Sequence, residues 1–491
     1  MNDDNKLGKP LLNPVDNVGY GSEINSEECE ELLPEDERTD TVHEGKLLRD
    51  WEGFMTLVKV NLGTGILGLP FAMKNSGLLF GPILLLFMAV LSTHCMHMLV
   101  TSSQIISKNV KAPSVDYGKT AEFSIIKIFP KKSFYARKFV NCVIWMMQYG
   151  FCATYILFMA ENLKQLVGHF DVKIWMLLLV PPLIVFSYIR SLDILSYMSF
   201  FANICLVTGL IIIYQYIFQG IHHIEKLPLI ASLDAIPLSF GSIIFAFEGI
   251  CAVLPLENRM KKPKNFSKVL WAAQTFITIC YMLMAVGGYL RYGSYSLGSI
   301  TLNLPKTPMA FNSYFGVMFV YRLRSFSIII LNILTLFPVS FAIVFIIHFN
   351  SQDKLSNKSN LVLTHLSRNA LAEAGEIKKG SIDLAYRTIM VIVTAALAIA
   401  VPKLGLFISL IGAFLGSMAC LVFPALIEIG THYSYCPPVS KWMILKDIII
   451  IILGCLCGIT GTSVTIYRLV LAFNGHTIHH NSLANVTLNL F

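Results

Sequence analysis

The segment KVNLGTGILGLPFAMKNSG, residues 59–77, decides the fold. It places Gly63, Gly65, Gly68 and Pro70 inside a run that is otherwise apolar enough to cross a bilayer. In a membrane helix, a cluster of small residues serves either close packing against another helix or an interruption of the helix. The segment alone leaves both interpretations open.

A second segment favours the interruption. The stretch SIIFAFEGICAVLP, residues 242–255, carries the acidic residue Glu248 next to Gly249, with Pro255 a little beyond. Corresponding interruptions in two halves of a chain are the best sequence indication of an inverted-repeat transporter with its site near the bilayer midplane. Unwound main chain in lipid exposes N–H and C=O groups that need a polar ligand, an ion or a lined cavity.

The polarity of helix ends suggests the kind of ligand. The start of a half-helix has free N–H groups that suit a carboxylate, and the carbonyls at the end of the preceding half-helix suit an ammonium group. A small zwitterion, an α-amino acid, matches both. We therefore expect the ligand to lie between the two interruptions.

The composition indicates an integral membrane protein. Hydrophobic residues make up 55% of the 491 residues, charged residues only 14%, and the mean hydropathy is +0.64. The first fifty residues carry 14 acidic and 5 basic side chains, a balance of −9, so the formal net charge of +8 leaves +17 on residues 51–491. These cations flank apolar runs, which favours membrane orientation over nucleic-acid binding.

The apolar runs predict an all-α membrane protein with about eleven transmembrane helices, because a crossing needs about 20 apolar residues. The expected architecture is a five-plus-five inverted repeat with broken first and sixth helices. A shorter run, 309–321, is interpreted as an interfacial segment or insertion. The candidate spans are 52–73, 78–102, 139–160, 174–189, 195–219, 236–256, 269–290, 325–349, 386–401, 404–427 and 448–472.

Basic loops predict the orientation. The segment between the second and third spans and the segment after the sixth are rich in Lys and Arg, and such loops stay in the cytoplasm. The amino terminus is therefore expected inside and the carboxyl terminus luminal or extracellular. Of three glycosylation sequons, Asn265 and Asn357 are expected to be bare and Asn485 to be glycosylated.

The chain divides into three predicted parts. Residues 1–48 form an acidic cytoplasmic tail expected to be disordered, 49–473 the transporter domain, and 474–491 a short luminal or extracellular tail. The first tail contains EECEELLP, in which Glu28, Leu32 and Leu33 have the spacing of an acidic dileucine sorting signal. Sorting adaptors are thus candidate partners, and both the plasma membrane and the endosome or lysosome are candidate locations.

Glu248 is the candidate of greatest interest, because an acid at a helix centre costs about 2.5–3.5 kcal/mol unless it has a partner, a proton or water. A structural hydrogen bond, proton carriage and substrate contact all remain open for it. Phe245 and Phe247 either pack or cover the substrate. Asn61 and Lys59 are weaker signals. His94 and His97 have a metal-like spacing, but without nearby acids they favour core hydrogen bonding, and no metal site is predicted.

The chain resembles the proton-coupled amino acid transporters of the amino acid/auxin permease group over residues 51–305 and 386–472. The strings that carry the resemblance are NLGTGILGLPFAMKNSG, THCMHMLV, QYGFCATYILFMAENLKQ, FGSIIFAFEGICAVLPLENRMKKPKNF and GSITLNLP. The resemblance implies the amino acid–polyamine–cation transporter fold and the carriage of small neutral amino acids, often with a proton. By motif, Gly63, Thr64 and Gly65 would meet the substrate carboxylate, and residues 245–249 would border the substrate opposite them.

Two departures from the family bear on coupling. Where several members of the family have a histidine implicated in proton coupling, this chain has Thr56, which cannot titrate near neutral pH. His94 matches the second-span histidine of the family and is a proton-coupling candidate beside Glu248. The extracellular cysteine pair of relatives is missing, since neither 161–173 nor 291–308 contains Cys.

The leading hypothesis is secondary transport of small neutral amino acids by proton symport with alternating access, without a cofactor. The alternatives are a pH-independent exchanger or facilitator and a lysosomal amino acid sensor that signals through its tail. An enzyme is not expected, because the sequence has no HExxH, GxSxG or GxxxxGK[ST] motif. The preferred amino acid does not follow from the sequence.

Overall fold

The structure is a computed structural model that describes residues 47–304 and 376–474, apart from 113, 169, 189–191, 220–226, 402 and 437–439. The described chain is helical, with one isolated bridge between Leu48 and Met260 as its extended pairing. The predicted eighth span at 325–349 and the run 309–321 lie outside the described residues, as do the sorting motif, Asn357 and Asn485.

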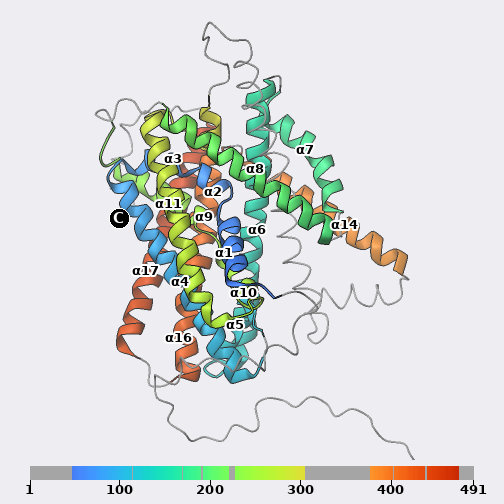
Figure 1. Cartoon of the computed structure of the whole chain (residues 1–491), viewed down its shortest axis with the longest axis vertical. Coiled ribbons are helices and arrows are strands. Elements are labelled where there is room, and N and C mark those ends of the chain that lie inside the picture. Colours follow the sequence, from blue (N-terminus) through green and yellow to red (C-terminus); the bar gives the residue numbers. More distant parts are fainter. Residues whose placement is uncertain are drawn as a thin grey trace, which may run out of the picture.

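The first predicted span is broken into three helices. They are α1 (Asp50–Asn61), α2 (Thr64–Leu67) and α3 (Leu69–Ser76), coloured blue in Figure 1. The helical hydrogen bonding lapses at Leu62 and Gly63 and again at Gly68, whereas Thr64 and Gly65 begin α2. The interruption predicted around residues 63–65 is therefore present, but it lies slightly earlier in the chain.

The first half continues through long helices. A turn at Gly77, whose φ of +95° favours glycine, leads from α3 into the next helix. The helices are α4 (Phe80–Val110), α5 (Tyr117–Ile125), α6 (Pro130–Val167), α7 (Val172–Ser187) and α8 (Leu192–Phe218).

The second half opens with the second break. Here α9 (Ile236–Ala246) stops before Phe247, and α10 (Ile250–Glu257) begins after Gly249. Pro255 lies inside α10 and does not end it. The later helices are α11 (Phe266–Tyr292), α14 (Glu376–Ala400), α15 (Leu404–Ile411), α16 (Phe423–Tyr435) and α17 (Lys441–Phe473).

Two π-helical segments, η8 (Gly412–Gly416) and η9 (Met418–Val422), join α15 to α16. The span predicted at 404–427 is therefore present but is not a regular α-helix throughout. Each π turn inserts a residue into the helical repeat and often marks a functional site. Here the π segments lie beside α9, because η8 packs directly against it.

Six described helical segments are long and apolar enough to cross a membrane, and three shorter apolar helices accompany them. Together with the broken α1–α3 segment they correspond to ten of the eleven predicted spans. The six are Phe80–Val110, Pro130–Gln165, Leu233–Glu257, Pro263–Tyr295, Leu404–Tyr435 and Lys441–Phe473, and the shorter ones are Val172–Ser187, Leu206–Phe218 and Arg387–Ala400.

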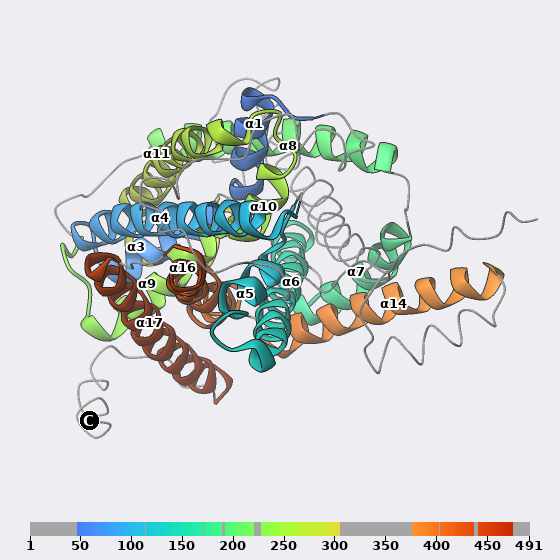
Figure 2. The same ribbon diagram turned by 90° about the horizontal axis from the view of Figure 1, so that it is seen from below.

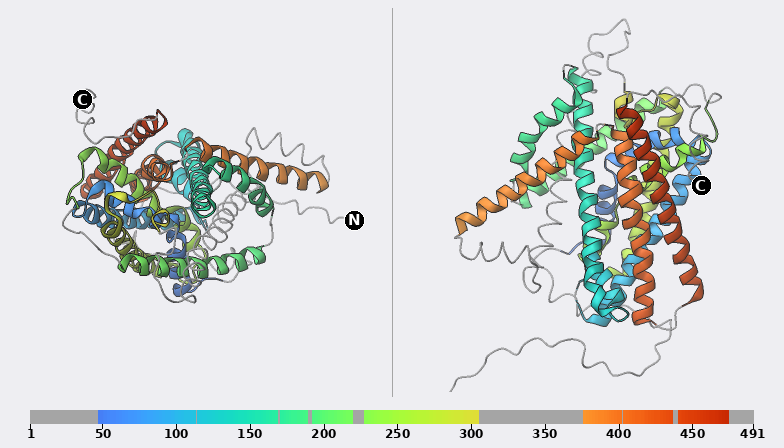
Figure 3. Two further views of the ribbon diagram at one scale, coloured as in Figure 1. Left: turned by 90° about the horizontal axis from the view of Figure 1, so that it is seen from above. Right: turned by 180° about the vertical axis from the view of Figure 1, so that it is seen from behind.

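The broken helix α9–α10 lies inside the bundle. In its apolar stretch 72% of the residues are buried, against 17% for α17, which lies at the periphery. Helix α9 packs against α3, α15 and α17. By contrast, α7 and α14 extend away from the bundle on one side (Figure 2). The same separation of α7 and α14 from the main group is visible from behind in Figure 3.

The two basic loops predicted to be cytoplasmic lie at one end of the bundle. Asn258, which follows α10, donates a hydrogen bond to the carbonyl of Val115 in the loop before α5. At the same end, Lys127 Nζ lies 2.9 Å from the carbonyl oxygen of Ser434 near the end of α16. Burial lowers the pKa of Lys127. The loops that the charge pattern assigned to one side are therefore neighbours.

Candidate functional site

The two breaks face each other across one tyrosine. The Tyr281 hydroxyl of α11 lies 2.5 Å from the carbonyl oxygen of Asn61, the last residue of α1, and 2.7 Å from that of Ala246, the last residue of α9. A hydroxyl has one proton to donate, so one hydrogen atom serves both carbonyls. The sequence analysis assigned such freed carbonyls to a ligand. In the structure a side chain of the protein occupies them.

Asn61 joins the first break to the second through its side chain. Its amide donates to the carbonyl of Leu57 at 2.9 Å, and its Oδ1 atom is buried without a hydrogen-bond partner in the described structure. A Cβ atom on Gly249 would come within 2.6 Å of Asn61 Nδ2, so only glycine fits there. Asn61, a weak signal in the sequence, thus lies between the two interruptions.

Gly63 is half-buried, and only the end of one side chain limits the space beside it. Its backbone is extended, with φ of −116°, and no side chain caps the start of α2 that follows it. A Cβ atom there would meet the hydroxyl of Tyr155 on α6 at 3.1 Å. Thr64 beside it is buried, with 3% of its surface exposed. The free N–H groups at the start of α2 are thus close to Tyr155.

Gly65 has no such room. A Cβ atom at this position would lie 2.7 Å from the Cα atom of Ala246, a backbone atom that cannot rotate away. The backbones of α2 and α9 therefore touch at Gly65. Close helix packing and a helix interruption were both open interpretations for this glycine cluster. In the structure, Gly65 serves close helix packing, whereas Gly63 borders the break.

Glu248 lies in the second break without a partner. Both carboxylate oxygens are buried, and neither has a hydrogen bond within the described part of the chain. The structural hydrogen bond considered for Glu248 from the sequence is therefore not formed in this conformation. Nearby, Ser92 Oγ of α4 donates to the carbonyl of Phe247 at 3.4 Å. A side chain of α4 thus satisfies the main chain at the break, whereas the Glu248 carboxylate has no hydrogen-bond donor among the described residues.

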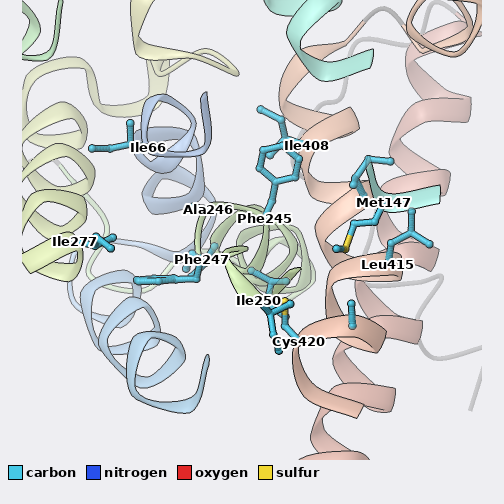
Figure 4. Close-up of a cluster of buried hydrophobic side chains, with 14 of the residues drawn as sticks. Ile66, Met147, Phe245, Ala246, Phe247, Ile250, Ile277, Ile408, Leu415 and Cys420 are labelled. Atoms are coloured by element: carbon cyan, nitrogen blue, oxygen red, sulfur yellow. The ribbon is translucent and has the colours of Figure 1, made fainter. Parts of the chain in front are cut away.

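Aromatic rings flank the second break on both sides. Figure 4 shows Phe245 beside Ile408 and Phe247 on the opposite side of α9, towards Ile277. The ring of Phe245 lies 4.9 Å from that of Phe151, and the ring of Phe247 lies 4.9 Å from that of Tyr281. Both phenylalanines are buried, with 4% and 1% of their surfaces exposed.

The structure separates the two proton-coupling candidates. His94 of α4 has a buried Nε2 atom without a partner in the described residues. Its charged neighbours are Lys446 and Glu428, which belong to α17 and α16. Glu248 lies in the break between α9 and α10, so the two candidates have different surroundings.

Two tyrosines and a close contact between α9 and the segment after α15 were not expected from the sequence. Tyr155 and Tyr281 lie in apolar runs with no local feature to distinguish them. On α9, Ser242 Oγ lies 2.6 Å from Ser409 Oγ of α15, and a Cβ atom on Gly412 of η8 would overlap the carbonyl of Gly241. The close approach of α9 to the π segment therefore depends on small residues on both sides.

Across residues 47–304 and 376–474, apart from the gaps given above, no group of three or more His, Cys, Asp or Glu side chains is arranged to hold a metal ion. The candidate site consists of main-chain groups, hydroxyls, one amide and one carboxylate. Such a set suits a small polar organic ligand and a proton.

Comparison with known proteins gives concordant results. The family model described as transmembrane amino acid transporter protein matches residues 49–467. The chain is 29% identical over 444 residues to a Drosophila melanogaster protein named proton-coupled amino acid transporter-like protein pathetic, covering 87% of this chain and 86% of that one. It is 26% identical over 451 residues to the Caenorhabditis elegans probable amino acid transporter skat-1, covering 88% and 92% of the two chains.

Proposed function

Because the chain belongs to the transmembrane amino acid transporter family, whose members are transporters and not enzymes, we propose that it moves small neutral amino acids with a proton by alternating access. The observation that carries the proposal is the buried, unpartnered carboxylate of Glu248 at a helix break tied to the first break by Tyr281. The name of the Drosophila relative refers to proton coupling, which supports the same proposal.

The first break would bind the substrate. Its carboxylate would accept hydrogen bonds from the N–H groups at the start of α2, next to Gly63 and Thr64, because no side chain caps them. The ammonium group would face the Asn61 Oδ1 atom, which is buried and has no donor in the described structure. Asn61 thus replaces the α1 carbonyl, which Tyr281 already occupies.

The second break would bind the proton. An ionised carboxylate without hydrogen bonds is costly in a buried site, whereas its protonated form is neutral. Protonation of Glu248 therefore lowers the cost of closing the site around it. Release of the proton on the other side of the membrane restores the charge and favours reopening. This links the proton to the conformational cycle without a cofactor.

Membrane placement is part of the proposal. The amino terminus would be cytoplasmic and the carboxyl terminus luminal or extracellular, with Asn485 glycosylated. The dileucine-like motif at Glu28, Leu32 and Leu33 would place the protein in endosomes or lysosomes when adaptors bind it, and at the plasma membrane otherwise.

The test is uptake into proteoliposomes with the membrane voltage clamped at zero. One proton per amino acid allows about tenfold accumulation for each pH unit of gradient, since about 1.4 kcal/mol corresponds to a factor of ten. Glycine, proline, alanine, tryptophan and arginine are compared at two external pH values. We expect accumulation of the small neutral amino acids and only background uptake of arginine. Equal inside and outside concentrations of the small neutral amino acids, whatever the pH gradient, would establish the pH-independent facilitator instead.

Glu248→Gln is the matched substitution for the coupling step. We expect it to abolish the response to external pH while exchange of the amino acid continues, because glutamine mimics the protonated acid. Glu257→Gln is the control, since Glu257 is also buried but accepts a hydrogen bond from Gln104 at 3.0 Å. A pH response that survives in Glu248→Gln would move the proton site elsewhere.

One contact favours a second candidate function, an amino acid sensor. Leu48 pairs with the loop after α10, donating its N–H to the Arg259 carbonyl at 2.9 Å and accepting from the Lys261 N–H at 2.8 Å. Movement of α10 on substrate binding would therefore reach the residues that follow the tail. Deleting residues 1–46 keeps this pairing. Loss of signalling with intact flux would support the sensor, and unchanged signalling would exclude it.

A further inference from the structure

Two carboxylates share one ammonium group where α16 ends and α17 begins. Lys446 Nζ lies 2.7 Å from Oε2 of Glu428 on α16 and 3.2 Å from Oδ1 of its neighbour Asp447 on α17. The two helices run side by side in Figure 3. The Asp447 side chain has no exposed surface, and that of Glu428 is 12% exposed. One cation therefore faces two enclosed acids.

The two carboxyl groups lie close together, because both contact Lys446 and Glu428 lies within hydrogen-bonding reach of Asp447. Apart from Lys446 and Glu428, no described residue donates a hydrogen bond to the Asp447 oxygens. Two ionised carboxylates that contact the same ammonium group repel each other. A single proton placed between them converts this repulsion into a charge-assisted hydrogen bond. With Lys446, that proton also brings the net charge of the cluster from −1 to zero.

The residues around the cluster favour the binding of a proton over that of a second cation. On α4, His94 and Cys95 lie near the cluster, and His97 lies near His94. On α16, His432 lies near Glu428 and Lys446. The segments α9, α15, η8 and η9, which pack against α17, contribute no charged side chain and no histidine. Lys446 already fills the place of a cation, so a metal ion or a second ammonium group would be repelled by it.

Other ion pairs in the described chain lack this excess of acid. Arg137 lies 3.2 Å from Glu122, and Lys164 lies 2.9 Å from Asp171, with one cation for each carboxylate. The Lys164 hydrogen bond holds the pKa of Asp171 below its usual value. A carboxylate with its own cation is not stabilised by a proton near neutral pH. The pair of Glu428 and Asp447, with two carboxylates for one cation, is stabilised by a proton.

We propose that Glu428 and Asp447 bind one shared proton beside Lys446, and that this is the site through which the coupled proton passes on the predicted cytoplasmic side. The coupling role rests on the proposed function, whereas proton binding does not. The proton forms an O–H bond to one carboxyl group, donates to the other, and leaves as a proton to cytoplasmic water. His94 of α4 lies near the cluster and has a buried Nε2 atom without a partner in the described residues.

Infrared difference spectroscopy of the purified full chain at acid and neutral pH tests proton binding. The wild type is expected to show a protonated carboxyl band that Asp447→Asn and Glu428→Gln each remove. Lys446→Arg retains the cation and should retain the band. Glu122→Gln is the control, because Glu122 has its own cation, and should leave the band unchanged. Glu248, for which a proton is also proposed, would give a carboxyl band of its own. A band whose intensity in both carboxyl variants equals that of the wild type therefore overturns the site.

Uptake into proteoliposomes at varied internal pH tests the coupling role. Acidifying the inside is expected to slow wild-type uptake severalfold, because release of the proton is opposed. Asp447→Asn should reduce the dependence on internal pH to less than twofold. Its thermal unfolding temperature should be close to that of the wild type. Retained dependence overturns the coupling role. A wild type that transports no amino acid overturns the proposed function instead, and the carboxyl band then decides the site alone.

Discussion

The two helix breaks use the same support but offer different chemistry. At both, the last carbonyl of the preceding helix reaches the Tyr281 hydroxyl. The first break, at residues 62–63, presents main-chain groups and has no charged side chain of its own. The second, at residues 247–249, carries Glu248 directly after the buried Phe247. One break is suited to a zwitterion and the other to a proton.

The shared hydroxyl would link the two binding events that we propose. Because one hydroxyl serves both carbonyls, a movement that pulls one helix end from Tyr281 leaves the hydrogen bond free for the other. Binding at one break therefore changes the hydrogen bonding at the other. Coupling through a shared donor needs no long chain of contacts. The predictions below test the two breaks separately and then the hydroxyl that joins them.

Gly65→Val should have the largest effect. Its side chain would collide with the backbone of Ala246, 2.7 Å from the new Cβ atom. Overpacking of this kind costs about 1–3 kcal/mol or more. We expect uptake to be lost together with a lower thermal unfolding temperature, measured on the purified protein. Loss of uptake with full stability would show that Gly65 contacts the substrate instead.

Gly53→Ala is the matched control for that substitution. Gly53 also lies in the broken first span, but a Cβ atom there would meet only the flexible side chain of Met260, at 3.4 Å. We expect stability and uptake near those of the wild type. A large loss in Gly53→Ala would mean that the whole α1 segment, and not the contact at Gly65, is intolerant of substitution.

The sequence predicted the existence of the breaks but not their support. Gly63, Gly249 and Glu248 are local signals, because an intramembrane acid is rare and because glycine-containing interruptions recur in two corresponding spans. Tyr281 carries no such signal. It lies 220 residues from Asn61 and 35 from Ala246, and its hydroxyl meets both only in the folded chain.

The same limit applies to packing and to charge. Nothing in the sequence separates Gly63 from Gly65, because the difference is the position of the α9 backbone. The π segments at residues 412–422 were likewise read as regular helix. Glu428, Lys446 and Asp447 sit at the ends of predicted spans, where charges are common, so their shared arrangement appeared only with the packing of α16 on α17.

Tyr281→Phe should have an intermediate effect. The ring and its contact with Phe247, 4.9 Å between centroids, are retained, but two buried carbonyls lose their donor. An unsatisfied buried group costs about 1–3 kcal/mol. We expect a lower unfolding temperature and a weaker dependence of uptake on external pH, both measured on the same preparation.

Tyr214→Phe controls for loss of a tyrosine hydroxyl. The Tyr214 hydroxyl on α8 lies 2.7 Å from the carbonyl of Cys280 in α11, and this carbonyl belongs to neither break. A smaller change in stability and an unchanged pH response are expected, because that carbonyl belongs to a continuous helix. Equal pH effects in the two variants would remove the special role of Tyr281.

Gly63→Ala should have the smallest effect and the most selective one. The φ of −116° is accessible to alanine, and the new Cβ atom would meet only the end of the Tyr155 side chain, at 3.1 Å. Stability should change by less than about 0.5 kcal/mol. If the substrate carboxylate binds at the start of α2, KM should rise severalfold while kcat is retained, because the added methyl group narrows that position in all states alike. Gly68→Ala, whose nearest neighbour would be 3.5 Å away, should leave KM unchanged. Equal KM values in the two variants would place the substrate away from the first break and leave the second break as the only candidate of the pair.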